Sequence, residues 1–318
     1  MEIAVWRTIQ KNNFRDLKTL ADFLHLDISC FSKEIRFPLN LPRRLAEKIE
    51  KGKLDDPLLK QFVPLPQEHK SFLDFVQDPL QETLFCKTSK LLQKYSGRAL
   101  LLTTSACAMH CRFCFRQNFD YAEKSLFKEE LEQIKSDTTL REIILSGGDP
   151  LSLSDDDLRL LIHNLEEIDH IKIIRFHSRF PIGIPERISS EFLKLLGQCS
   201  KQIVFVLHAN HPKEFDEEIF SALKSIQKLG IPILLQSVLL QGINDEGAIL
   251  KQLFENCIYY GIIPYYLHQL DKVRGAAHFE VPEEKGKKLL EELRKSLPGY
   301  ALPLFVREIP KESSKTLL

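Results

Sequence analysis

Residues 99–116 read ALLLTTSACAMHCRFCFR, and this stretch decides the fold of the chain. The apolar run 99–102 comes just before a loop that carries Cys107, Cys111 and Cys114. Three residues separate the first two cysteines and two separate the last pair, so the loop is short. A loop of this spacing can place three thiolates around one face of an iron–sulfur cube and leave the fourth iron without a protein ligand. That iron can then bind another molecule.

The cysteine cluster has two weaker interpretations. A structural zinc ion normally takes four protein ligands, but the other four cysteines are scattered singly along the chain. His110 could be a fourth ligand, although its position next to Cys111 is poor for closing a tetrahedron. A zinc-stabilised nucleic-acid-binding module is therefore the lesser alternative. A disulfide framework is weaker still, because the seven cysteines are an odd number and the chain begins MEIAVW, without a secretory segment. We expect a reducing, cytoplasmic setting.

The overall composition limits the possible partners. The 318 residues are enough for one large α/β domain with an appendage. Lysine plus arginine and aspartate plus glutamate each number 44, so the formal net charge is zero. This balance argues against a general polyanion-binding surface, and no apolar run approaches the length that spans a bilayer. We expect no nucleic-acid partner and no membrane partner.

The hydrophobic pattern changes twice along the chain. Residues 1–97 are helical in pattern but interrupted by prolines, and we expect an N-terminal helical region there. Residues 98–300 alternate short apolar runs with longer amphipathic ones, and residues 301–318 form a C-terminal segment. The expected strands are 99–103, 142–146, 172–176, 202–207, 231–238 and 263–267. The expected helices are 128–136, 155–168, 190–196, 217–229, 247–260 and 283–296, with Ser154 as the N-cap of the second.

Six strands that are each followed by a helix predict an α/β fold with a parallel sheet. Their number and spacing favour a partial, open TIM-like (β/α)6 barrel, although a doubly wound sheet has the same strand pattern. In both architectures ligands bind at the carboxyl ends of the strands. Polar residues gather at those ends, and the most informative groups are Ser146, Gly147, Gly148, Asp149, His177, Ser178, Arg179, His208, Asn210, His211, His268 and Asp271. The glycine pair is a tight turn or a place where a bound amino acid approaches the backbone.

The chain resembles the lysine 2,3-aminomutase family of radical S-adenosylmethionine enzymes. The motifs that carry the resemblance are Cys-x-x-x-Cys-x-Phe-Cys, Ser-Gly-Gly-Asp-Pro, His-Ser-Arg, His-Ala-Asn-His-Pro and Pro-Tyr-Tyr-Leu-His-Gln-Leu-Asp, and they run through nearly the whole chain. Residues 271–279 and the tail that ends soon after Ser-Lys-Thr are similar to the branch that serves β-lysylation of elongation factor P.

The resemblance implies an isomerase with three cofactors: a [4Fe-4S] cluster, S-adenosyl-L-methionine and pyridoxal 5′-phosphate. It implies conversion of L-α-lysine to (R)-β-lysine by a 5′-deoxyadenosyl radical mechanism on a pyridoxal phosphate aldimine. The implied partners are L-lysine, a reductant such as flavodoxin or ferredoxin, and elongation factor P with its lysyl-ligase. An aminomutase for glutamate or another amino acid is the alternative within the same chemistry.

The resemblance also implies roles for single residues. Lys315, which composition alone would place in a mobile polar tail, matches the lysine that binds pyridoxal phosphate as a Schiff base. The further matches are Tyr95 and Arg98, with Lys94 less surely, for pyridoxal phosphate; Ser146, Gly147, Gly148, Asp149, His208 and Gln236 for S-adenosylmethionine; Cys107, Cys111 and Cys114 for the cluster; Arg116 for the substrate α-carboxylate; and Asp271 and Glu308 for its side-chain ammonium. Glu308 departs from the aspartate that most relatives acting on free lysine carry.

Overall fold

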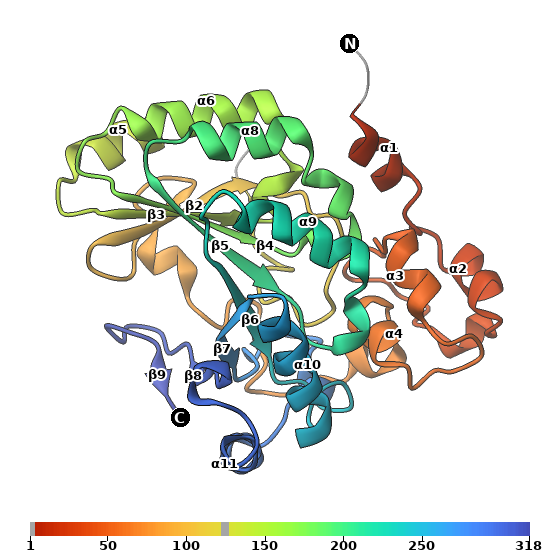
Figure 1. Cartoon of the computed structure of the whole chain (residues 1–318). Coiled ribbons are helices and arrows are strands. Elements are labelled where there is room, and N and C mark those ends of the chain that lie inside the picture. The colour runs from red at the N-terminus through yellow and green to blue at the C-terminus, as the bar shows by residue number, and fades with distance from the viewer. Residues whose placement is uncertain (1–3, 122–126) are drawn as a thin grey trace.

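Nine strands form one sheet in the order of the sequence (Figure 1). The computed structural model describes residues 4–121 and 127–318. The strands are β1 (Leu91–Leu92), β2 (Arg98–Thr104), β3 (Glu142–Gly147), β4 (Ile173–Ser178), β5 (Gln202–His208), β6 (Ile233–Val238), β7 (Ile263–His268), β8 (Leu304–Arg307) and β9 (Thr316–Leu317). Strands β2 to β8 pair in parallel, while β1 and β9 are antiparallel at the two ends of the order. The predicted open α/β barrel is confirmed.

The helices that connect the parallel strands cover the outside of the sheet (Figure 1). They are α5 (Lys128–Ser136), α6 (Asp155–Glu166), α7 (Phe180–Gly183), α8 (Ser190–Gln198), α9 (Glu217–Gln227), α10 (Gly247–Tyr259) and α11 (Glu283–Arg294). Their apolar residues recur at helical spacing; in α10, Leu250, Leu253, Phe254 and Cys257 are buried. The predicted cap at Ser154 is confirmed, since its side chain accepts a hydrogen bond from the Asp157 amide.

The C-terminal segment corrects the predicted strand count. All six predicted strands form, but β8 continues the parallel run, and β9 folds back on it through the pair Val306 and Leu317. Seven parallel strands therefore stand where the sequence predicted six. The four residues of β8 are too few for a periodic signal, and burial of Phe305 and Val306 against the core places them. The segment that carries Lys315 is thus tied to the sheet.

Residues 4–62 lie together at one side of the barrel (Figure 1), whereas β1 of the same N-terminal region is part of the sheet. Their helices are α1 (Val5–Lys11), α2 (Leu17–Leu24), α3 (Arg43–Lys48) and α4 (Pro57–Phe62). Trp6, Leu20, Leu45 and Phe62 are buried in the same apolar cluster as the residues of the barrel strands. The N-terminal helices therefore share a continuous core with the barrel, and the three-part division of the chain stays a prediction.

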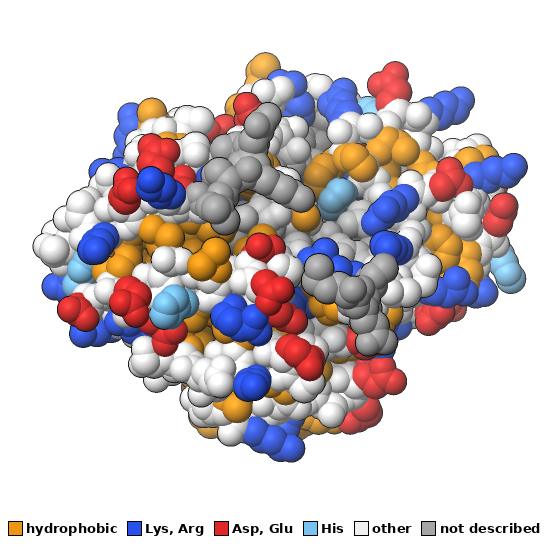
Figure 2. All heavy atoms as spheres, turned by 90° about the horizontal axis from the view of Figure 1, so that it is seen from above, with side chains coloured by type: hydrophobic (Ala, Val, Ile, Leu, Met, Phe, Trp, Pro, Cys, Tyr) orange, Lys and Arg blue, Asp and Glu red, His pale blue; other side chains and the backbone are white. Residues whose placement is uncertain are grey.

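The surface agrees with the balanced composition. Lysine, arginine and acidic side chains are interspersed over the face seen in Figure 2. Within the described ranges, no helix is both long enough and apolar enough to cross a bilayer.

Candidate active site

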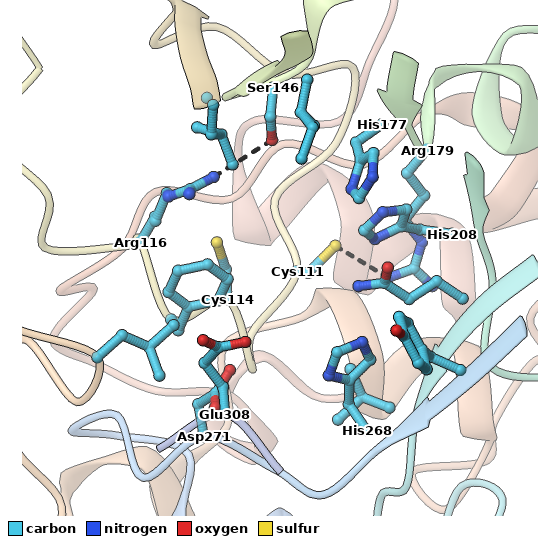
Figure 3. A pocket seen from close by; sticks show the side chains of 18 of the residues that line it. Cys111, Cys114, Arg116, Ser146, His177, Arg179, His208, His268, Asp271 and Glu308 are labelled. Carbon is cyan, nitrogen blue, oxygen red and sulfur yellow. Dashed lines mark hydrogen bonds between the residues drawn. The ribbon is translucent and has the colours of Figure 1, made fainter. Parts of the chain in front are cut away.

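One cavity of about 530 Å³ lies inside the open barrel, at the end where the parallel strands point (Figure 3). Strands β2 to β8, the cysteine loop and the C-terminal segment all contribute to its wall. The wall includes every residue that the sequence predicted for the cluster, the two organic cofactors and the substrate. Residues far apart in the sequence meet here because the carboxyl ends of parallel strands share one edge.

The cysteine loop follows β2 and brings Cys107, Cys111 and Cys114 to the cavity. Burial raises the pKa of all three thiols, that of Cys114 to about 12. Thiols of raised pKa are poor ligands until a metal displaces their protons, as it does when a thiolate site loads. Nearby arginines act in the opposite direction, Arg179 on Cys111 and Arg116 on Cys107 and Cys114, but burial outweighs them.

The N-terminal region holds the cysteine loop in place. Arg112, which is 1% exposed, makes a two-point ion pair with Glu68, with Nε–Oε1 at 2.8 Å and Nη2–Oε2 at 2.5 Å. The amide of Asn13 donates to the carbonyl of Ala108, and that of Asn40 donates to the carbonyl of Cys107. These buried contacts satisfy backbone groups that a loop would otherwise leave unpaired.

His110 is held against the N-terminal region. Its Nδ1 lies 2.8 Å from the carbonyl oxygen of Pro38, and its ring stacks on Phe37 with the centroids 4.5 Å apart. In the described part of the chain, no group of three or more histidine, cysteine or acidic side chains is arranged to hold a metal ion. A [4Fe-4S] cluster has a different requirement, because each thiolate binds a different iron atom.

The glycine pair brings β3 against the cysteine loop. Gly147 has a φ of +114°, which is costly for any residue with a side chain. A Cβ on Gly148 would lie 2.3 Å from the carbonyl oxygen of Ala106. The pair therefore permits close contact between two segments of the chain itself, next to Cys107.

The carboxylate of Asp149 accepts hydrogen bonds from other groups of the chain. It accepts hydrogen bonds from the hydroxyl of Ser178 and from the backbone amides of Leu151, Arg179 and Phe180, at 2.8–3.0 Å. Burial raises its pKa to about 6 in spite of these donors. Asp149 thus joins the end of β3 to the turn after β4 and positions Arg179.

Three histidines at strand ends face the cavity with unsatisfied nitrogens. The Nε2 atoms of His177, His208 and His268 are buried, with no hydrogen-bond partner among the described residues. Burial, with nearby cations, lowers the pKa of all three rings, that of His208 to about 3. They are neutral hydrogen-bonding groups, and a polar ligand could satisfy them. Gln236 lies beside them in β6 and also lines the cavity.

Arg116 has a partner that the sequence did not indicate. Glu82 makes a two-point ion pair with it, with Nε–Oε2 at 2.8 Å and Nη2–Oε1 at 2.6 Å. The third contact of the guanidinium is its Nη1 with the hydroxyl of Ser146, at 3.3 Å (Figure 3). A guanidinium has five N–H groups, so two have no partner among the described residues and can serve another acceptor.

Lys315 lies in a cluster of charged groups centred on Glu308. One carboxylate oxygen accepts from Lys315 Nζ at 2.5 Å, and the other from Lys94 Nζ at 2.5 Å and from the Tyr95 hydroxyl. Burial alone would raise the pKa of Glu308, but Lys315, Lys94 and Tyr95 outweigh it and lower the pKa. Lys94 therefore belongs to the same group of charged side chains around Glu308 as Lys315.

Asp271 is the second acid at this end of the cavity, next to Glu308 (Figure 3). Burial raises its pKa to about 7; Lys315 works in the opposite direction, and Glu308 adds to the increase. An enclosed carboxyl of this kind becomes a full anion most readily when a cation arrives.

Sequence reasoning assigned no role to Glu82, Arg175 or Tyr266, all of which line the cavity. Arg175 pairs with Glu142 at 2.8 Å, and Tyr266 lies under Lys315 Nζ, 5.8 Å from the ring centroid. Arg175 and Tyr266 sit in the interior of strands, where alternation alone could have indicated that they face the barrel.

Comparison with known proteins agrees with this geometry. A model of the radical SAM superfamily matches residues 101–253. The L-lysine 2,3-aminomutase of Haemophilus influenzae is 39% identical over 98% of this chain and 95% of that protein. The chain belongs to the lysine 2,3-aminomutase family. Another member, the L-lysine 2,3-aminomutase of Escherichia coli, is 42% identical over 89% of this chain and 83% of its own length.

Comparison with solved structures supports the same fold. A radical SAM methyltransferase from Sphaerobacter thermophilus matches with a TM-score of 0.51 and 16% identity, over 68% of each chain. The cofactors of the lysine 2,3-aminomutase family are a [4Fe-4S] cluster, S-adenosylmethionine and pyridoxal phosphate.

The residues present fit these three groups. The thiols of Cys107, Cys111 and Cys114, on the loop after β2, can bind the iron–sulfur cluster. Unpartnered histidine nitrogens offer hydrogen bonds to a polar cofactor such as S-adenosylmethionine. A primary amine, Lys315, shares the cavity with the cations Arg98 and Arg175, which suit a phosphate dianion.

Proposed function

We propose that the chain is an L-lysine 2,3-aminomutase that forms (R)-β-lysine. One observation carries the proposal: a single cavity holds three cysteine thiols together with Lys315 and two acids, Asp271 and Glu308. The thiols suit a radical-generating cluster, and the lysine suits pyridoxal phosphate. Relatives that cover most of the chain bear the name L-lysine 2,3-aminomutase, which agrees with this combination.

The charges in the cavity favour lysine as the substrate. Arg116 has two N–H groups without a partner in the described ranges, and a planar guanidinium can bind an α-carboxylate at two points. Asp271 and Glu308 form an acidic end that a side-chain ammonium would neutralise. A glutamate side chain would instead bring a third carboxylate to this end, which like-charge repulsion opposes.

The chain's own residues prepare the reaction. When bound, the cluster and S-adenosylmethionine supply a radical that abstracts hydrogen, and pyridoxal phosphate supplies a carbonyl carbon that takes the amino group. The ion pair with Glu308 holds Lys315 Nζ in the cavity, where Nζ would react with such a carbon once it has lost its proton. Tyr95 and Arg98, which line the same cavity, would hold the phosphate.

The test is anaerobic incubation of the reconstituted protein with reductant, S-adenosylmethionine, pyridoxal phosphate and L-lysine, followed by chiral analysis of the product. We expect (R)-β-lysine from lysine and no β-amino acid from glutamate. Lys315→Ala should abolish the product, while Lys311→Ala, at an exposed lysine of the same segment, should not. If the fully loaded enzyme forms no β-lysine, the substrate assignment is wrong.

We further propose a cytoplasmic role in the modification of elongation factor P. Residues 271–279 resemble that branch of the family, and all seven cysteines are unpaired thiols, as in a reducing compartment. A lysyl-ligase would attach the product, and flavodoxin or ferredoxin would supply the electron. Deletion of the gene should lower the mass of elongation factor P by one β-lysyl group. An unchanged mass would contradict the link.

A further inference from the structure

A buried arginine reaches one sulfur of the cysteine loop. Arg179 follows β4 directly and is 9% exposed. Its Nη1 donates a hydrogen bond to Sγ of Cys111 over 2.9 Å (Figure 3). Within the described residues, neither Cys107 nor Cys114 has such a bond from a charged side chain to its sulfur. The three thiols are therefore not equivalent.

Two fully buried side chains hold the other nitrogen of this guanidinium. Arg179 Nη2 donates to Oε2 of Glu214 at 2.7 Å and to Oε1 of Gln61 at 2.8 Å. Glu214 and Gln61 are both 0% exposed. The remaining oxygen of Glu214 accepts from the backbone amides of Asn210 and His211 at 2.8 and 2.9 Å. The carboxylate cannot turn away without leaving buried donors unpaired.

Two aromatic rings restrict the guanidinium further. Its central carbon lies 4.8 Å from the ring centroid of Phe62 and 5.4 Å from that of Phe113. Phe113 belongs to the cysteine loop, so the same loop supplies the sulfur and one ring. A cation held this way is desolvated, and its field is screened less than it would be in water.

We propose that Arg179 is a positioning residue that orients the Cys111 thiolate and makes the iron–sulfur cluster easier to reduce. The inference rests on the proposed binding of that cluster by the three cysteines. Reduction adds one electron from an external reductant, and no bond to Arg179 forms or breaks. A fixed positive charge stabilises the more negative reduced cluster, and an N–H donor at a thiolate weakens its donation to iron.

The test is an EPR-monitored redox titration of the reconstituted protein with dithionite as the reductant, without and with S-adenosylmethionine. We expect Arg179→Met to disfavour the reduced cluster about tenfold, a fall of about 59 mV for one electron. Arg179→Lys keeps the charge but loses the planar fork of N–H donors. The reduction potential of its cluster should therefore lie between those of the wild type and Arg179→Met. The fall should already be present without S-adenosylmethionine, because it does not depend on binding that cofactor.

Two further variants separate this effect from loosened packing. Arg187→Met removes a second buried arginine, which pairs with Asp155 and donates to the carbonyl of Leu151 away from the sulfurs, and the potential should not change. Glu214→Gln keeps Arg179 and removes its counter-charge, so the potential should stay the same or rise. If Arg179→Met does not assemble a cluster, a lower potential in Arg179→Lys supports the inference, and an unchanged one overturns it.

The outcomes distinguish this inference from the proposed function. If the wild-type protein assembles a cluster and the reduction potential is the same in Arg179→Met, the role of Arg179 is overturned but the proposed function is not. A shift that appears only after S-adenosylmethionine is added would also overturn it, since Arg179 would then act on that cofactor. A wild-type protein that assembles no cluster would overturn the proposed function, and this inference with it.

Discussion

Asp271→Asn should make the protein more stable and less active on lysine. The enclosed carboxyl has a pKa of about 7 against an ordinary value of 3.8. A raised pKa means that the folded state holds this proton more tightly than the unfolded state. The wild type therefore loses stability as the pH rises from about 4 to about 7, where the folded state must bear a buried charge. Asparagine bears no charge at any pH and avoids this loss.

The size of the effect follows from the pKa. One pKa unit corresponds to about 1.4 kcal/mol, so the two units between pH 5 and pH 7 correspond to about 3 kcal/mol. Residual solvent contact of Asp271 reduces this to about 2–3 kcal/mol. A chain of 318 residues shifts its Tm by roughly 1.5 °C per kcal/mol. The variant's gain in Tm over the wild type should be about 3–4 °C larger at pH 8 than at pH 5.

Thermal unfolding of the cofactor-free proteins at the two pH values measures this gain. Asp156→Asn is the control, because that side chain is 85% exposed on α6 and its variant should show no gain that depends on pH. The same Asp271→Asn protein, once loaded with cofactors, should form β-lysine poorly because the ammonium site has lost a charge. A gain in Tm that is equal at pH 5 and pH 8 would refute the electrostatic reasoning, and full activity on lysine would refute the assignment of the site.

Three other variants probe the remaining parts of the cavity. Arg116→Lys loses the two-point geometry toward a carboxylate, so KM for lysine should rise at least tenfold while pyridoxal phosphate binding stays unchanged; an unchanged KM would contradict the assignment. Lys315→Ala should remove the visible absorption of lysine-bound pyridoxal phosphate, and a band that persists would place the Schiff base elsewhere. Gly148→Ala would place a methyl 2.3 Å from the Ala106 carbonyl, so the iron content after reconstitution should fall; full iron content would show that the loop can move aside.

Much of the fold follows from local sequence patterns. Apolar runs of five to eight residues alternate with amphipathic segments, and this alternation alone predicts parallel strands with helices outside them. The cysteine spacing is equally local, since three thiols within eight residues must lie on one loop. The cavity position follows as well, because polar residues at the carboxyl ends of parallel strands converge. β8 escaped prediction because four residues carry no usable period.

Partnerships between distant residues could not be predicted in this way. Glu82 and Arg116 are 34 positions apart, and Arg179 and Cys111 are 68 apart. No spacing rule joins them, because each pair depends on how the loops pack on the finished barrel. The same holds for Lys315, which composition places in a mobile tail and which the pairing of β9 with β8 fixes beside Glu308.

The sequence by itself thus determined which chemical groups this protein has and at which strand ends they occur. Only the tertiary structure decided which charges neutralise one another and which sulfur has a cation beside it. The physical reason is range. Strand and helix propensities act over a few residues, whereas burial and Coulomb interactions depend on distances in space that arise when the sheet curves.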